Sequence, residues 1–90
     1  PALKLTFSRR AWAQYRHWIN TDPKVLARLN ELIEASMRDP FAGIGKPEPL
    51  KNELKGLWSR RLTAEDRIVY RVRGSGEDQV VEIVQCRFHY

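Results

Sequence analysis

The segment Thr21-Asp22-Pro23 constrains the fold more than any other feature, because it leaves no linker between two amphipathic stretches. Asp22 can accept hydrogen bonds from free backbone N–H groups, and Pro23 suits the first position of a helix, where its missing N–H would be unpaired anyway. Apolar residues recur at helical spacing on both sides of this boundary. They are Ala11, Trp12, Tyr15, Trp18 and Ile19 before it, and Val25, Leu26, Leu29, Leu32, Ile33 and Met37 after it. Together with a potential N-cap at Ser8, this pattern predicts two helices packed as an antiparallel hairpin.

The other segments have the two-residue periodicity of β-strands. Residues 3–7 alternate as Leu-Lys-Leu-Thr-Phe, and three strand-like runs follow the helices, at about 57–63, 67–73 and 79–90. Turn residues separate these runs at positions 63–66 and 74–78. We therefore predict an α+β fold with the order β-α-α-β-β-β, in which a helical hairpin packs on one face of a mostly antiparallel twisted sheet. The 90 residues are expected to form one domain, 1–90.

Residues 39–49, between the second helix and the later strands, contain three prolines and two glycines. That composition is typical of a loop. We expect apolar packing to anchor it, through Phe41, Ile44 and the neighbouring Leu50.

The composition excludes several classes of protein. A chain of 90 residues has little room for an enclosed ligand cavity. No run of about 18 apolar residues is present to span a membrane. The N-terminus lacks the apolar stretch of a secretion signal, so we expect a cytoplasmic protein. Cys86 is the only cysteine, which rules out an internal disulfide and a cysteine-based zinc cluster.

The charge distribution favours a polyanionic partner. The net charge is +5, and 11 of the 16 basic residues are arginines, whose planar guanidinium groups bind phosphate in a fork. Between positions 55 and 73 the chain has six basic residues against two acidic ones. The basic residues are Lys55, Arg60, Arg61, Arg67, Arg71 and Arg73. We expect this part of the surface to face nucleic acid or an acidic protein segment.

The predicted strands decide which of these groups share a sheet face. Arg61 and Arg67 lie on the same face if the turn between them is a three-residue loop or contains a bulge, and we predict that arrangement over a two-residue hairpin. In the last strand, one face would carry Val81, Ile83, Gln85, Arg87 and His89, and the other Val80, Glu82, Val84, Cys86, Phe88 and Tyr90. The first set changes from apolar to polar toward the C-terminus, so we expect it to line an open site there.

One group of polar side chains has the chemistry to cleave an RNA phosphodiester bond. It consists of Arg61, Arg67, Arg87 and His89 on the sheet, with Glu48 and Lys51 from the adjoining loop. The reaction needs a base for the 2′-OH proton, an acid for the departing 5′-oxygen, and cations for the charge on phosphorus. Glu48 and His89 supply the titratable pair and Arg67 the cation, and no metal or cofactor is required. On residue types alone, a solvated glutamate and an incidental histidine are the commoner reading, so a non-catalytic RNA-binding or protein-interaction module stays open.

Four motifs, in order along the chain, carry a resemblance to a known family. They are Lys46-Pro-Glu-Pro-Leu-Lys51, Leu57-Trp-Ser-Arg-Arg61, Asp66-Arg-Ile-Val-Tyr70 and Cys86-Arg-Phe-His-Tyr90. The chain closely resembles the YoeB (Txe/YoeB) toxins of bacterial type II toxin–antitoxin systems, within the RelE-like superfamily, over essentially its whole length. The resemblance implies the RelE-like fold and a metal-independent, ribosome-dependent endoribonuclease. Such an enzyme cuts messenger RNA in the ribosomal A site through a 2′,3′-cyclic phosphate and inhibits translation.

Roles for individual residues follow from the matching motifs. The resemblance implies that Glu48 is the general base and His89 the general acid, with Tyr90 positioning the substrate beside it. Arg67 is implied as the cation on the scissile phosphate. Lys51 and Arg61 are implied as supporting phosphate contacts.

The resemblance also implies partners, namely messenger RNA on the ribosome and a cognate YefM-like antitoxin. Exposed aromatic residues on the first helix would allow a homodimer. Phe88 and Ile44 replace a tyrosine and a charged residue that are common in the family, and neither is a proposed catalytic group. The alternative within the superfamily is a ParE-like inhibitor of DNA gyrase, which shares the fold and lacks the glutamate–histidine pair.

Overall fold

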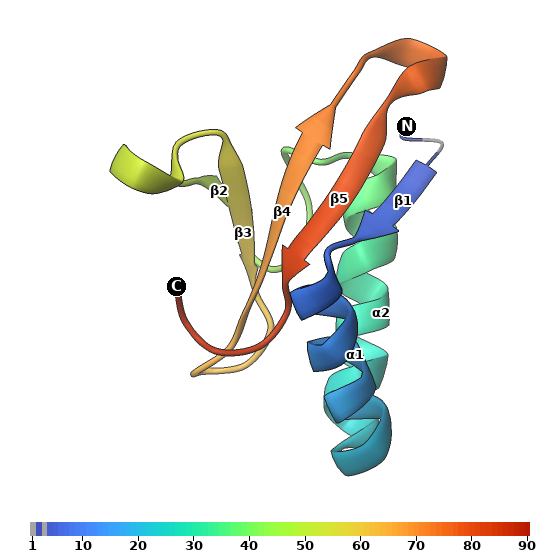
Figure 1. Ribbon diagram of the computed structural model, residues 1–90, viewed down its shortest axis with the longest axis vertical. Helices are drawn as coiled ribbons and strands as arrows, with labels where there is room; N and C mark the ends of the chain where they lie inside the picture. The colour runs from blue at the N-terminus through green and yellow to red at the C-terminus, as the bar shows by residue number, and fades with distance from the viewer. Residues whose placement is uncertain (1, 3) are drawn as a thin grey trace.

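A layer of two helices covers one face of a five-stranded sheet in the computed structural model, which describes Ala2 and residues 4–90 (Figure 1). In chain order the elements are β1 (Lys4–Phe7), α1 (Arg9–Thr21), α2 (Pro23–Arg38), β2 (Glu48–Pro49), the 3₁₀ turn η1 (Asn52–Leu54), β3 (Leu57–Arg61), β4 (Arg67–Arg73), the 3₁₀ turn η2 (Gly76–Asp78) and β5 (Val80–Gln85). The predicted α+β class is confirmed. The order contains one strand more than predicted, because Glu48 and Pro49 pair with β3 as β2. Leu3, in the first predicted strand, lies outside the described residues.

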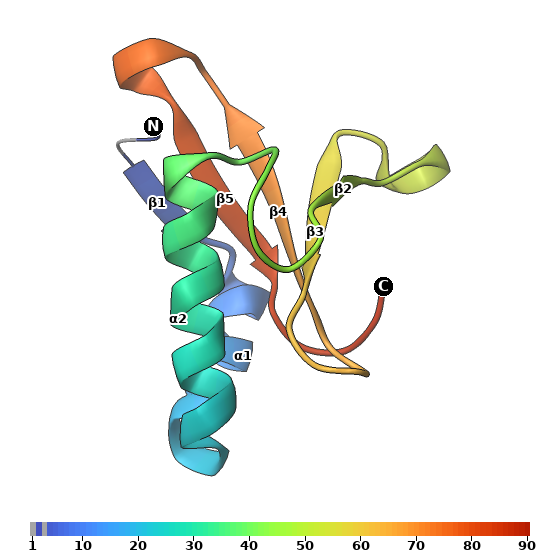
Figure 2. The same cartoon turned by 180° about the vertical axis from the view of Figure 1, so that it is seen from behind.

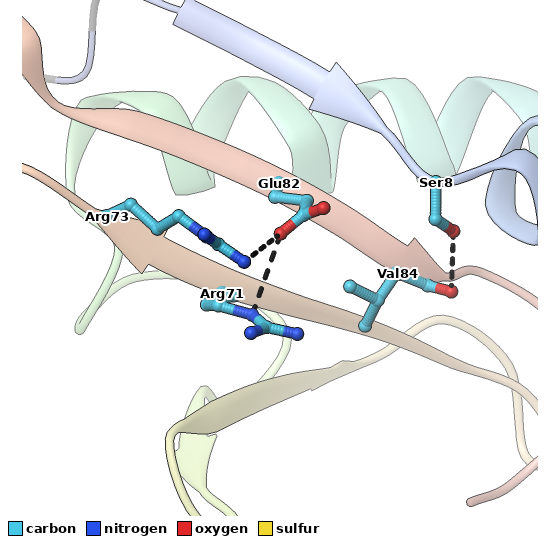
Figure 3. A network of polar contacts seen from close by, with 5 residues as sticks. All are labelled: Ser8, Arg71, Arg73, Glu82 and Val84. Carbon is cyan, nitrogen blue, oxygen red and sulfur yellow. Dashed lines mark hydrogen bonds and ion pairs between the residues drawn. The ribbon is translucent and has the colours of Figure 1, made fainter.

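Both predicted helix starts are confirmed. The Ser8 hydroxyl accepts a hydrogen bond from the Ala11 N–H at 3.1 Å and donates one to the Val84 carbonyl at 3.1 Å, which ties the start of α1 to β5 (Figure 3). At the start of α2, Asp22 Oδ1 accepts hydrogen bonds from the next turn, including the Val25 N–H at 3.1 Å. The two helices run antiparallel, as predicted (Figure 2).

The strand order in the sheet is β1-β5-β4-β3-β2. The β1–β5 pair is parallel and the other three pairs are antiparallel, which confirms the mostly antiparallel sheet. Figures 1 and 2 show that both helices lie on one side of the sheet. We call the opposite side the open face, and it carries Ser59, Arg61, Arg67, Arg71 and Glu82. Among the described residues, no helix has both the length and the apolar character needed to cross a membrane.

The hydrophobic core lies between the helices and the sheet. From α2 it takes Leu29 and Leu32, which are fully buried, and from the sheet it takes Ile68, Val81 and Ile83. Of the apolar residues of α1, Ala11 and Trp18 are buried, whereas Trp12 and Ile19 each expose about half of their surface. The expectation of exposed aromatic surface on the first helix is therefore confirmed for Trp12.

The prediction for the last strand is wrong in its length and in part of its alternation. β5 ends at Gln85, and its register shifts beside β4, where Tyr70 pairs with Ile83 but Val69 pairs with Gln85. The intervening Val84 is the extra residue of a β-bulge. The predicted alternation therefore holds only as far as Ile83.

After the bulge, Cys86 turns toward α1 instead of sharing the face of Val80 and Glu82. It is fully buried, its Sγ lies 3.4 Å from the Ala11 carbonyl oxygen, and its own carbonyl accepts a hydrogen bond from Trp18 Nε1 at 2.8 Å. The backbone therefore leaves the sheet at Cys86, and the last four residues, 87–90, form no strand.

Candidate functional site

Arg61 and Arg67 are direct partners across β3 and β4 and share the open face, as predicted. The connection is longer than a two-residue hairpin, because the Leu62 N–H donates to the Asp66 carbonyl across it. Within this turn Thr63 Oγ1 bonds to Asp66 Oδ2 at 2.7 Å. Arg67 Nη1 donates to the carbonyl of Thr63 at 2.8 Å. The turn thus fixes the guanidinium of Arg67 at the edge of the open face.

The same turn also binds the C-terminal segment through hydrogen bonds. The Phe88 N–H donates to Asp66 Oδ1 at 2.7 Å, and the Phe88 carbonyl accepts from the Arg67 N–H at 3.0 Å. The side-chain amide of Gln85 donates to the Arg87 carbonyl at 2.9 Å. Phe88 has a φ of 68°, a left-handed conformation in which the chain reverses direction. Figure 1 shows the result, in which the chain curls away from β5 and ends beside β3.

Tyr90, the last residue, links the C-terminus to β2 and β3. Its phenol oxygen lies 3.2 Å from Ser59 Oγ and 3.4 Å from Glu48 Oε1. Glu48 and Ser59 are themselves partners in the β2–β3 register. Glu48 was expected in a loop, and its place on an edge strand is what puts its carboxylate on the open face.

The remaining predicted residues lie at different distances from this centre. His89 is exposed, and its ring centroid lies 4.6 Å from that of Tyr90. Lys51 is exposed immediately before η1. Arg87 does not join the group, because its guanidinium lies over the rings of Phe88 at 4.4 Å and Trp18 at 6.0 Å.

Arg60 was counted with the basic surface residues, and that prediction is wrong. Its side chain is fully buried on the helix side of the sheet. It donates hydrogen bonds to three carbonyl oxygens of the 39–44 loop, those of Asp39 at 2.6 Å, Ala42 at 2.9 Å and Ile44 at 2.9 Å. Charge-assisted hydrogen bonds of this kind satisfy a buried guanidinium.

Tyr70 also holds the 39–44 loop in place, together with Arg60. Its hydroxyl accepts from Arg60 Nε at 3.1 Å and donates to the Pro40 carbonyl at 2.6 Å. Burial raises the pKa of the Tyr70 phenol, and the hydrogen bond from Arg60 acts in the opposite direction. Of the three predicted apolar anchors, Leu50 is buried and Phe41 packs against Trp58 with 4.9 Å between the ring centroids, whereas Ile44 is 43% exposed.

The loop between α2 and β2, held by Arg60 and Tyr70, determines where β2 lies. Gly45 has a φ of 82°, and a Cβ there would lie 2.7 Å from Leu32 Cδ2, so the loop passes too close to the core for a side chain. Its carbonyl accepts from the Arg61 N–H at 2.7 Å. Glu48 follows three residues later. The position of its carboxylate therefore depends on Arg60, which no sequence motif distinguishes from its exposed neighbour Arg61.

The assembled site brings a carboxylate, a phenol and an imidazole to one end of the open face, with two guanidinium groups nearby. Glu48, Arg61, His89 and Tyr90 are exposed and Arg67 is half-buried. Side chains of this kind can accept and donate protons and can bind a polyanion. Within the part of the chain that the structure describes, no three His, Cys, Asp or Glu side chains come together as they would around a metal ion.

Comparison with known proteins identifies the family. A model of the YoeB-like toxins of bacterial type II toxin–antitoxin systems matches residues 7–90. Toxin YoeB of Streptomyces coelicolor is 49% identical over 88 residues, which are 98% of this chain and 100% of that protein. This chain belongs to the YoeB family of toxins. Toxin YoeB of Escherichia coli K12 is 47% identical over the same shares of the two chains.

Solved structures agree with this assignment to the YoeB family. A YoeB/ParE toxin from Agrobacterium tumefaciens has a TM-score of 0.93 and 52% identity, covering 98% of this chain and 100% of that one. A YoeB dimer and a heterotetrameric YoeB-YefM complex, both from Staphylococcus aureus, have TM-scores of 0.83 and 0.85. Each is 38% identical and covers 98% of both chains.

Proposed function

We propose that this YoeB-family toxin is a metal-independent endoribonuclease that cuts messenger RNA in the ribosomal A site and so inhibits translation. One observation carries the proposal. The Tyr90 phenol lies 3.4 Å from Glu48 Oε1 and the ring of His89 lies 4.6 Å from that of Tyr90, centroid to centroid, so Tyr90 connects the proposed acid to the proposed base. These groups are 41 and 42 positions apart in the chain.

In the reaction, the phosphorus exchanges its bond to the 5′-oxygen of the following nucleotide for a bond to the 2′-oxygen of the preceding ribose. Glu48 accepts the proton of the 2′-OH as that oxygen attacks phosphorus. The bond to the 5′-oxygen breaks, and the protonated imidazole of His89 gives its proton to the departing oxygen. A 2′,3′-cyclic phosphate and a free 5′-OH result. Glu48 ends protonated and His89 neutral, so a proton exchange with water restores the starting state.

Cationic side chains stabilise the charge that develops on the phosphate oxygens. Arg67 is the proposed cation on the scissile phosphate, and hydrogen bonds to the turn carbonyls hold its guanidinium in place. Arg61, its partner across the strands, and Lys51, after β2, bind flanking phosphates. Tyr90 positions the substrate beside His89.

The proposed partners are the ribosome and a cognate antitoxin of the YefM kind. The Staphylococcus aureus YoeB, at 38% identity, was solved in complex with YefM and also as a dimer. A net charge of +5 suits an acidic antitoxin segment that folds on binding. The exposed Trp12 on α1 offers apolar surface for a second copy. We place the protein in the cytoplasm, where its substrate is.

Primer extension on a reporter message in a reconstituted translation reaction tests the function. Wild-type protein should produce discrete cuts within A-site codons, and the cuts should require ribosomes. Glu48→Gln and His89→Gln should each reduce cutting by about a hundredfold or more, the usual contribution of a general acid or base.

Two alternative outcomes would refute the proposal. An intact message with halted translation would indicate a non-catalytic ribosome-binding module. An intact message with normal translation would lead to an assay of DNA gyrase supercoiling, where inhibition would indicate a ParE-like activity. Arg16→Gln, an exposed change on α1, serves as the control and should cut like the wild type.

A further inference from the structure

Arginine side chains continue along the open face beyond the candidate site. In β4, Arg67, Arg71 and Arg73 occupy alternate positions and so project from one face of the strand. At about 3.3 Å per residue, Arg73 lies about 20 Å along the strand from Arg67. The proposed reaction uses Arg67 and gives no role to Arg71 or Arg73.

One carboxylate lies between these two arginines (Figure 3). Glu82 is the partner of Arg71 in the β4–β5 register, and its Oε1 lies 3.6 Å from Arg71 Nε and 3.5 Å from Arg73 Nη2. These separations exceed ordinary hydrogen-bond lengths. Among the described residues, Arg71 Nε and Glu82 Oε1 have no hydrogen-bond partner. Two positive charges around one negative charge leave a local excess of +1.

Both arginine side chains remain accessible to a ligand. The exposed fraction is 43% for Arg71 and 60% for Arg73, against 27% for Glu82. Arg71 also lines a cavity of about 240 Å³ beside η1. The other lining residues are Glu53, Lys55, Gly56 and Leu57. We call Lys55, Arg71 and Arg73 the basic strip.

We propose that the basic strip binds backbone phosphates of ribosome-associated RNA outside the cleavage site, and that Glu82 competes with this phosphate for the guanidinium groups of Arg71 and Arg73. This inference rests on the proposed function. Arg71, Arg73 and the Arg61–Arg67 pair lie on the same sheet face, with the buried residues Ser59 and Val69 between them, so RNA that contacts both ends passes over this middle part. A length of about 20 Å accommodates several nucleotides at about 3.4 Å of rise each.

The guanidinium donors favour phosphate over other anions. An arginine presents a planar fork that matches two phosphate oxygens, and an Arg–phosphate contact displaces condensed counterions from RNA. Glu82 limits the affinity, because its charge attracts the same guanidinium groups and repels phosphate. Its removal therefore separates a binding role of the arginines from a purely internal ion pair.

The test measures binding of the whole protein to bacterial ribosomes programmed with a short message, over a series of salt concentrations. The Arg71→Gln/Arg73→Gln variant should bind more weakly, and the slope of log K against log salt should become shallower by about 1.4, for two contacts with single-stranded RNA. Glu82→Gln should bind more tightly than the wild type at low salt. The control, Arg10→Gln/Arg16→Gln on α1, makes the same change in net charge at exposed positions and should keep the wild-type slope.

Messages that end at the A-site codon, compared with messages extended on both sides, identify the RNA. If the arginine variant loses affinity only on ribosomes that carry the extended message, the phosphates belong to messenger RNA. If it loses affinity equally with both messages, they belong to ribosomal RNA. An unchanged slope in the arginine variant, or weaker or unchanged binding by Glu82→Gln, would overturn the proposal. The proposal would also be overturned if the arginine variant kept its affinity for ribosomes and lost affinity only for an acidic antitoxin segment. Absence of cleavage by the wild-type protein would refute the proposed nuclease activity. The binding comparisons would still test the basic strip, because they do not depend on cleavage.

Discussion

Arg61 lies directly opposite Arg67 across β3 and β4, although both side chains are positively charged. Like charges at directly opposed positions destabilise a sheet. The carbonyl oxygens of Thr63 and Asp66 accept hydrogen bonds from the Arg67 guanidinium at 2.8 and 2.9 Å, which offsets part of the repulsion. Arg61 is exposed and makes no comparable contact among the described residues. The pair therefore lowers stability at the place where a phosphate is proposed to bind.

Arg61→Gln should stabilise the fold while weakening ribosome binding. Removing one charge relieves the repulsion, and we expect the free energy of unfolding to rise by about 0.5 kcal/mol at low salt. Because salt screens exposed charges, the gain should shrink as salt is added. Urea denaturation at two salt concentrations measures it, with Arg16→Gln on α1 as the control. A loss of stability in Arg61→Gln would contradict this account of the pair.

Tyr90→Phe should slow cleavage while leaving the fold intact. The variant removes the hydroxyl that lies between Glu48 and Ser59, and we expect the single-turnover rate to fall about tenfold, the equivalent of one hydrogen bond. Ser59→Ala removes the other partner of that hydroxyl. If the two act through one contact, the double variant should cleave at the rate of Tyr90→Phe alone. Fully additive losses would show that Ser59 does not position Tyr90.

The helices and the central strands could be predicted from the sequence because local patterns determine them. Ser8 and Asp22 cap the helices through hydrogen bonds to residues within the next turn. The face shared by Arg61 and Arg67 followed from counting residues in one turn. These features depend on neighbours in the chain, and the periodicity of the sequence records them.

The path of the C-terminal segment and the burial of Arg60 depend instead on residues that are distant in the sequence. The bulge at Val84 and the turn at Phe88 are stabilised by contacts with Ser8 and Asp66, which no local pattern reveals. Arg60 and Arg61 are adjacent and chemically identical, yet one is buried and the other exposed. Strand alternation alone places them on opposite faces. It does not say which face the helices cover at that point.

Arg60→Lys should destabilise the fold strongly, whereas Arg61→Lys should not. A lysine cannot reach the carbonyls of Asp39, Ala42 and Ile44 at once, so buried acceptors lose their partners at about 1–3 kcal/mol each. We expect a loss of about 3 kcal/mol or more in the free energy of unfolding. The exposed neighbour should change by about 0.5 kcal/mol or less. Urea denaturation of the two variants, made by the same substitution, gives the comparison.

Alkaline pH should destabilise the protein partly through Cys86. Burial raises the pKa of its thiol from the ordinary 9.0 to about 12. Below pH 9 the thiol is protonated in both states, and it makes no pH-dependent contribution. Between 9 and about 12 the unfolded chain loses the proton while the folded chain keeps it, so the free energy of unfolding falls as pH rises.

Cys86→Ala isolates this contribution. The variant should be less stable than the wild type at neutral pH, because a buried side chain becomes smaller. From neutral pH to about pH 10.5 its stability should fall less steeply than that of the wild type, in which the thiol costs up to about 1.4 kcal/mol per pH unit. Both proteins keep the buried Tyr70, whose raised pKa acts in the same direction, so their difference reports on Cys86 alone. Urea denaturation across the alkaline range measures both slopes. Parallel slopes would mean that the folded state ionises Cys86 as readily as the unfolded chain does, and rapid alkylation of the folded thiol would then be expected.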